Sequence, residues 1–140
     1  MILLDTNVLS ETLRPAPDPN VVAWLRAVDE STGITAVTVA ELAAGVAVLP
    51  DGVRRDRLQG AVHVVVEEFR CADAVIAFDA DAAMAYGDVV AARRAVGRPI
   101  GALDAQIAAI ARCSEAALAT RNTKDFDGLG LDLVDPWSHR

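Results

Sequence analysis

The stretch ILLDTNVLSETL, residues 2–13, decides the fold. Apolar residues run from Ile2 to Leu4, a carboxylate follows at Asp5, and a polar Thr-Asn pair then begins an amphipathic segment. A short apolar run with a helical pattern directly behind it is typical of a buried strand that feeds a helix. We therefore predict a strand over residues 2–5 and a helix over residues 6–13, with a charged side chain at their junction.

The rest of the chain repeats this alternation of short apolar runs and helical patterns. Prolines close the first helix, and a Gly and a Pro close the helix that ends near residue 97. Strands are predicted at residues 34–37, 75–78, 116–120 and 131–134, and helices that begin near residues 20, 38, 51, 79 and 102. Strands that alternate with helices indicate parallel βαβ units, so we predict an α/β fold with an open, doubly wound parallel sheet.

Composition limits the classes of protein to consider. A chain of 140 residues with 53% hydrophobic and only 4% aromatic content suits one domain with helices packed closely on a sheet. The longest apolar stretch, Leu42–Leu49, is far shorter than the ~20 residues of a membrane span, and no signal peptide is visible. Cys71 and Cys113 lie in no metal-binding or disulfide pattern, so we expect reduced, buried thiols and a cytoplasmic protein.

The charge balance opposes binding to nucleic acid. Twenty acidic residues against thirteen basic ones give a formal net charge of −7. A polyanion is repelled by such a molecule unless basic side chains cluster locally or a cation intervenes. Net charge alone therefore does not decide the partner.

Several polar residues follow predicted strands, where parallel sheets bind their ligands. They are Asp5 after the first strand, Glu41 about one turn beyond the second, Asp104 at the start of the helix before the fourth, and Thr120, Arg121 and Asn122 after the fourth. In a doubly wound sheet these elements converge at one edge. The sequence therefore predicts an acidic pocket there.

Each acid also has an ordinary structural explanation. Asp5 suits the N-cap of the helix that follows it, Thr38 and Glu41 match a capping box, and Asp104 suits a helix dipole. Asp125 suits a turn or a cap. The combination favours chemistry, because gathered carboxylates repel one another unless they are protonated or bridged by a cation. Mg²⁺ or Mn²⁺, which takes oxygen ligands, would bridge them and admit a phosphodiester.

Four blocks, LLDTNVLSETLRP, TAVTVAELAAGV, ALDAQIAAIA and LATRNTKDF, resemble the signature blocks of PIN-domain ribonucleases, and specifically of VapC toxins from type II toxin–antitoxin systems. The resemblance implies a single PIN domain over residues 1–140, built as an α/β/α sandwich with a central parallel sheet. It implies a Mg²⁺- or Mn²⁺-dependent endoribonuclease, a hydrolase acting on phosphodiester bonds. It also implies a homodimer that is neutralised by a cognate VapB-type antitoxin.

Carried onto this sequence, the resemblance makes Asp5 and Asp104 metal ligands and Glu41 a second acid that positions a water molecule. Asn7 and Thr120 take an orienting role. The fourth block departs from the pattern of many relatives, which place an acid two residues after the strand-end threonine. Here that position is Asn122, with Asp125 three residues later, and we expect both to support the site.

Other interpretations were weighed against the same residues. A haloacid-dehalogenase-type phosphatase needs a second Asp two residues after the first, where this chain has Asn7, and the acceptor and lysine of a receiver domain are not convincingly present. A catalytically degenerate PIN-fold module that binds RNA or antitoxin stays open because of Asn122. Arg121 is the leading RNA-binding candidate, and the others are Arg14, Arg93, Arg94 and Arg98. His63 and His139 are assigned to structure or solvent.

Overall fold

One parallel sheet organises the molecule. The computed structural model describes all 140 residues. Its five strands, in the order β3-β2-β1-β4-β5, are β1 (Ile2–Leu4), β2 (Thr32–Thr35), β3 (Val75–Ile76), β4 (Ala117–Ala119) and β5 (Leu133–Val134). β1 lies in the centre, with Leu3 opposite Gly33 on one side and Leu118 on the other. The end of β1 therefore lies at the middle of the carboxyl edge of the sheet.

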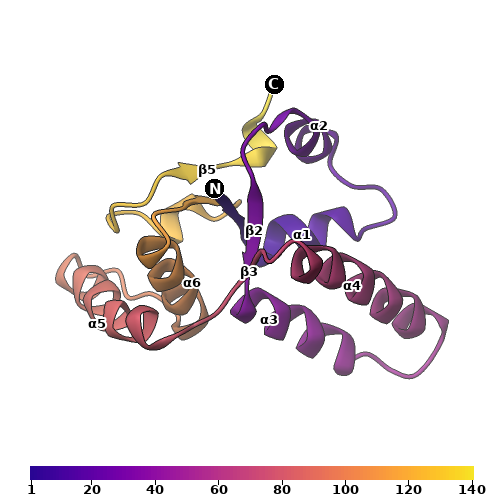
Figure 1. Ribbon diagram of the computed structural model, residues 1–140, viewed down its shortest axis with the longest axis horizontal. Helices are drawn as coiled ribbons and strands as arrows, with labels where there is room; N and C mark the ends of the chain where they lie inside the picture. Colours follow the sequence, from indigo (N-terminus) through magenta and orange to yellow (C-terminus); the bar gives the residue numbers. More distant parts are fainter.

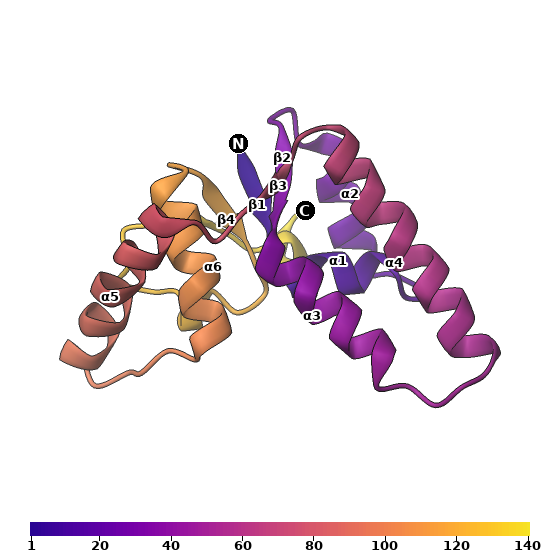
Figure 2. The same cartoon turned by 60° about the horizontal axis from the view of Figure 1, so that its bottom comes forward.

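Helices cover both faces of this sheet. They are α1 (Thr6–Thr12), α2 (Pro19–Ala27), α3 (Ala36–Ala47), α4 (Val53–Cys71), α5 (Ala80–Ala95) and α6 (Ala102–Cys113), with 3₁₀ turns at Thr123–Asp125 and Pro136–Ser138. α5 and α6 lie together on one side of the strands, and α1 to α4 lie on the other (Figures 1 and 2). This α/β/α sandwich with a parallel sheet confirms the predicted fold class. None of the six helices combines the length and the apolarity of a membrane span.

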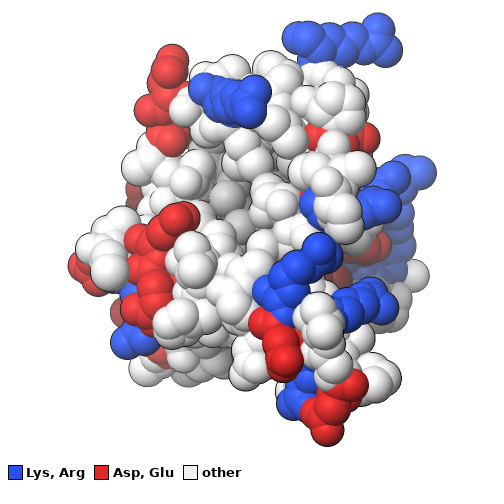
Figure 3. All heavy atoms as spheres, turned by 90° about the vertical axis from the view of Figure 1, so that its right-hand side faces the viewer, with Lys and Arg blue, Asp and Glu red and all other residues white.

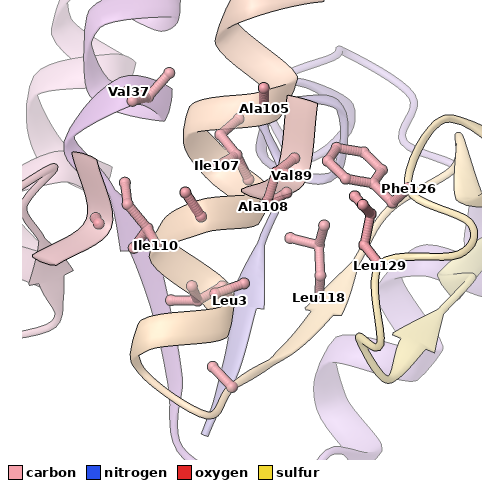
Figure 4. Packing of buried hydrophobic residues seen from close by; sticks show 14 residues of the cluster. Leu3, Val37, Val89, Ala105, Ile107, Ala108, Ile110, Leu118, Phe126 and Leu129 are labelled. Atoms are coloured by element: carbon pink, nitrogen blue, oxygen red, sulfur yellow. The ribbon is translucent and has the colours of Figure 1, made fainter. Parts of the chain in front are cut away.

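The alternation of side chains along β1 creates two hydrophobic cores. Leu3 packs with α5, α6 and β4 residues such as Ile107 and Leu118, whereas Ile2 and Leu4 belong to the core under α1 to α4. Figure 4 shows the first of these cores between α6, β1 and the loop after β4. Because β1 is buried on both faces, its end is fixed by packing on both sides.

Several local predictions are wrong. β3 ends at Ile76 rather than at residue 78, and β5 begins at Leu133 rather than at residue 131. The second strand ends at Thr35 rather than Val37, because the Thr35 hydroxyl oxygen accepts the N–H of Thr38 at 3.0 Å and so caps α3. The predicted burial of Cys71 and Cys113 is also contradicted. Both thiols are free and exposed, because each cysteine is the last residue of a helix.

Candidate functional site

Asp5 lies at the centre of the carboxyl edge and is almost fully buried, with 4% of its surface exposed. It caps α1, because its Oδ1 accepts the backbone N–H of Thr6 at 2.8 Å. Its Oδ2 accepts the hydroxyl of Thr120 at 2.7 Å and the side-chain amide of Asn7 at 3.0 Å. The structural explanation for Asp5 is therefore correct, yet capping occupies only one of its two oxygen atoms.

Thr120 and Asn7 hold Asp5 from two elements. Thr120 follows β4 directly and is fully buried, because β4 pairs with β1 and brings the two strand ends together. The Asn7 amide also donates to the Thr120 hydroxyl at 3.2 Å, and its carbonyl oxygen accepts the backbone N–H of Arg121 at 3.3 Å. Both residues thus contact Asp5, as an orienting role requires.

Glu41 faces the same edge from α3. α3 begins at Ala36, so Thr38 lies inside the helix, and the predicted capping box of Thr38 and Glu41 does not form. Instead, Glu41 Oε1 accepts the hydroxyl of Thr6 at 2.8 Å, and that hydroxyl lies 3.1 Å from the hydroxyl of Thr38. The contact joins α3 to α1 beside Asp5 and leaves Oε2 of Glu41 without a hydrogen bond.

Asp104 shows that the acidic side chains affect one another. It lies half-buried in the first turn of α6, and its pKa is raised from 3.8 to about 6, chiefly by burial and then by the charges of Asp5, Asp125 and Glu41. Burial likewise raises the pKa of Asp5, against the effect of its hydrogen bonds, and the charge of Glu41 adds to the rise. Such raised pKa values are typical of carboxyl groups gathered for a function.

The loop after β4 carries the two residues of the divergent block. Asn122 is exposed; its backbone N–H donates to the Thr120 hydroxyl at 3.1 Å, while its side chain forms no hydrogen bond. Asp125 is also exposed and closes the 3₁₀ turn Thr123–Asp125. Its carboxylate accepts no hydrogen bond, so it caps nothing, and its charge acts on Asp104 instead.

Arg93 is a residue whose role the sequence analysis missed. Proposed there as an RNA contact, it is in fact buried, with 4% of its surface exposed. Its guanidinium donates to the carbonyl oxygens of Lys124 at 3.3 Å and Asp127 at 2.9 Å, and its Nε has no partner. Arg93 therefore fastens the turn that carries Asp125 to α5. A signal was present, because Arg93 falls on the same helix face as the buried Ala82 and Val89.

Arg121, the leading RNA-binding candidate, lies at the exposed rim of the site. Its guanidinium stacks over the ring of Trp137 at 5.2 Å from the ring centre. Such stacking holds an arginine in place at a modest gain in free energy. The backbone of Arg121 therefore lies next to Asn7, whereas its side chain is held against Trp137 and is exposed.

The donor set fits a hard divalent cation. No three acidic, histidine or cysteine side chains approach one another closely enough to hold a metal ion among themselves. Mg²⁺ does not need such a cage, because it is usually held by one or two carboxylates, with water and substrate phosphate as the remaining ligands. The acidic side chains here offer oxygen atoms only, and a cation would compensate both the burial of the Asp104 charge and its repulsion by Asp5, Asp125 and Glu41.

Comparisons with known proteins identify the family of the chain. The model of the PIN domain family matches residues 2–130. A VapC ribonuclease of Sinorhizobium fredii is 42% identical over 98% of both chains, and the toxin FitB of Neisseria gonorrhoeae is 38% identical over 98% of this chain and 99% of its own. A solved structure of FitAB bound to a DNA fragment superposes with a TM-score of 0.92 at 37% identity, covering 100% of this chain and 98% of the other.

The family model spans nearly the whole chain, and both relatives align with it almost end to end. The structural match covers the sheet and all six helices, including the elements that carry Asp5, Glu41 and Asp104. The chain therefore belongs to the PIN-domain family, and its resemblance to VapC-type toxins is confirmed.

Proposed function

We propose that this protein is the toxin of a type II toxin–antitoxin system and acts as a Mg²⁺- or Mn²⁺-dependent endoribonuclease. The observation that carries the proposal is the gathering of carboxylates at one sheet edge: Thr6 hydrogen-bonds to both Asp5 and Glu41, and Asp104 lies close enough for their charges to add to the effect of burial on its pKa. Nuclease activity is supported by the family and by the relative that is named a ribonuclease.

In the proposed mechanism Asp5 and Asp104 hold the metal ion, and Asn122 and Asp125 support the site from the loop after β4. The bound ion would polarise a phosphoryl oxygen and lower the pKa of a water molecule. The contributions of the protein are then positional. Thr120 and Asn7 fix Oδ2 of Asp5, and the N–H of Thr6 fixes its Oδ1.

Glu41 is the residue that we assign to the attacking water. Its Oε1 is held by the hydroxyl of Thr6, so the carboxylate has a fixed orientation. Its Oε2 is then the atom that accepts a hydrogen bond from the water and takes its proton as the oxygen attacks phosphorus. The P–O bond to the leaving nucleotide breaks in the same displacement, and the leaving oxygen takes a proton from solvent. Asp5 and Asp104 would be committed to the metal ion, so we assign this task to Glu41.

Partner binding belongs to the same proposal. We propose a cognate VapB-type antitoxin, which the likeness to the toxin FitB and to the FitAB structure supports, and a homodimer. Apolar surface is available: a cavity of about 270 Å³ between α3 and α4 is lined by Val39, Val46, Val62 and Val66, and Val64 is 58% exposed. Such surface on a small protein is typical of binding sites for other proteins.

Metal-dependent cleavage of a total RNA pool by the purified protein tests the proposal. We expect cleavage with Mg²⁺ or Mn²⁺ and none in EDTA, with the cut sites mapped by end sequencing. Asp104→Asn should reduce cleavage by more than about 10–100-fold, the cost of losing even an outer residue of a metal site. Asp88→Asn, an exposed Asp on α5, is the matched control.

A degenerate binding module is the competing function, and the exposed, unbonded side chain of Asn122 favours it. That function predicts that the parent protein binds RNA or antitoxin but does not cleave RNA in the presence of Mg²⁺ or Mn²⁺. If Asp104→Asn cleaved RNA at the parental rate, the protein would still be a nuclease, but the assignment of Asp104 to its catalytic site would be contradicted.

A further inference from the structure

A second cavity opens directly beside the acidic edge. It has a volume of about 420 Å³ and lies between α1, α3 and α4. Thr6 and Glu41, which hydrogen-bond to each other next to Asp5, line one part of it. The size falls within the range of about 300–1,000 Å³ that is typical of ligand pockets. The cavity is therefore continuous with the proposed catalytic residues.

Three arginines line the same cavity. They are Arg14, from the turn after α1, and Arg54 and Arg57, from the first turns of α4. Arg14 pairs with Glu11 at 3.3 Å, whereas Arg54 and Arg57 are exposed and form no ion pair. Figure 3 shows this side of the molecule, on which blue side chains gather in the right and lower right part with several red side chains among them.

Two unpaired arginines in one cavity are unexpected in a chain of net charge −7. Arg54, Arg57 and Leu58 lie three and four residues apart, so one face of α4 turns them toward the cavity. Arg55 and Gln59, on the neighbouring face, line the apolar cavity between α3 and α4 instead. Arg54 and Arg57 thus lie on a different face of α4 from Arg55 and Gln59.

We propose that this cavity binds the sugar-phosphate backbone of the RNA substrate next to the bond that is cut, with Arg54 and Arg57 as phosphate ligands. The inference rests on the proposed ribonuclease function. A guanidinium presents a planar set of donors that matches the oxygens of a phosphate. Leu13, Leu42 and Leu58 supply apolar contacts for ribose or base.

The assignment also explains how an acidic protein admits a polyanion. The negative pocket around Asp104 receives a phosphodiester only with a cation present, and the arginines attract the adjacent phosphates from the side of α4. They therefore affect binding of RNA rather than the chemical step. In cleavage assays their loss should raise KM and leave kcat at saturating RNA nearly unchanged.

Salt-dependent RNA binding provides the test. The double variant Arg54→Gln/Arg57→Gln is compared with its parent, and both proteins also carry Asp104→Asn so that the RNA is not cleaved during the measurement. Fluorescence anisotropy measures the affinity for a short single-stranded oligoribonucleotide from about 50 to 200 mM salt. The control Arg55→Gln/Arg70→Gln removes the same charge from the same helix, but these arginines pair with Asp51 and Glu67. Circular dichroism checks that all proteins are folded.

We expect the Arg54/Arg57 variant to lose about tenfold in affinity and the slope of log K against log salt to become shallower by about 1.4, since each contact with a single strand contributes about 0.7. The control should keep both values. An equal loss of RNA affinity in the control would show that the effect comes from the net charge of the protein rather than from these two arginines, and would overturn the inference.

Unchanged affinity and slope in the Arg54/Arg57 variant would also overturn it, while cleavage by the wild-type protein would still support the proposed function. Loss of antitoxin binding with RNA binding intact would assign the cavity to a protein partner and refute the RNA assignment. A wild-type protein that neither binds nor cleaves RNA would contradict the proposed function itself.

Discussion

Replacing Asp104 by Asn should stabilise the metal-free protein, although it removes a residue assigned to catalysis. Asp104 accepts no hydrogen bond from another side chain or backbone group, so replacing its carboxylate by an amide breaks no contact. The substitution removes only a charge that burial and the charges of Asp5, Asp125 and Glu41 disfavour. The shift of its pKa from 3.8 to about 6 corresponds to about 3 kcal/mol at 1.36 kcal/mol per unit. Because the group is only half-buried, solvent screening reduces this to about 1 kcal/mol.

The pH dependence of the difference follows from the sign of the shift. A raised pKa means that the folded state binds the proton more tightly than the unfolded state, so the penalty of the charged form is complete above about pH 6 and absent below about pH 4. The variant should therefore be more stable than the parent at pH 7.5, and the two should converge as the pH falls toward 4.

Denaturant and thermal unfolding in EDTA at a series of pH values measure this difference, with Asp88→Asn as the control for loss of one exposed carboxylate. We expect the midpoint of thermal unfolding to rise by about 3–5 °C at pH 7.5. Saturating Mn²⁺ should reverse the order, because a ligand that binds only the folded parent stabilises it. A variant that is less stable than its parent in EDTA at pH 7.5 would refute the reasoning.

Other substitutions give distinct expectations. Asp5→Asn should abolish cleavage and lower the free energy of unfolding by about 1 kcal/mol in chemical denaturation. The two oxygen atoms of Asp5 accept hydrogen bonds from three donors, and an amide in their place loses at least one of these bonds. A variant more stable than its parent would contradict this expectation. Asn122→Asp should tighten Mn²⁺ binding in calorimetric titration by adding a charge, whereas Asp125→Ala should weaken it modestly; complete loss in Asp125→Ala would make that residue a direct ligand. Arg93→Ala should cost about 2–4 kcal/mol by denaturant unfolding, and a neutral effect would argue against its role in fastening the turn.

The residues at the sheet edge were predictable because strand ends in a parallel sheet meet at one place. Asp5 and Thr120 each follow a short apolar run in the sequence, and pairing of β1 with β4 brings them within 2.7 Å. The position of Asp104 at the start of a helix was equally visible. These residues lie far apart in the sequence, and their meeting was predictable from the general rule that parallel sheets bind ligands at the carboxyl ends of their strands.

Features that depend on competition between elements were not predictable. Val37 continues the β-branched run of the strand, yet the hydroxyl of Thr35 caps a helix that begins at Ala36 and includes Val37. The helical spacing of Arg93 from Ala82 and Val89 indicates its burial, but its partners are carbonyl groups more than thirty residues away in the chain. No local pattern around an arginine indicates such partners.

Anomalous scattering from crystals soaked in Mn²⁺ tests the central claim, that Asp5 and Asp104 hold the catalytic metal, most directly. The account predicts a manganese peak in contact with a carboxylate oxygen of each of these residues, at the carboxyl edge beside Glu41, and the loss of that peak in Asp104→Asn. A manganese ion bound elsewhere, or no bound ion in a protein that cleaves RNA with Mn²⁺, would contradict it.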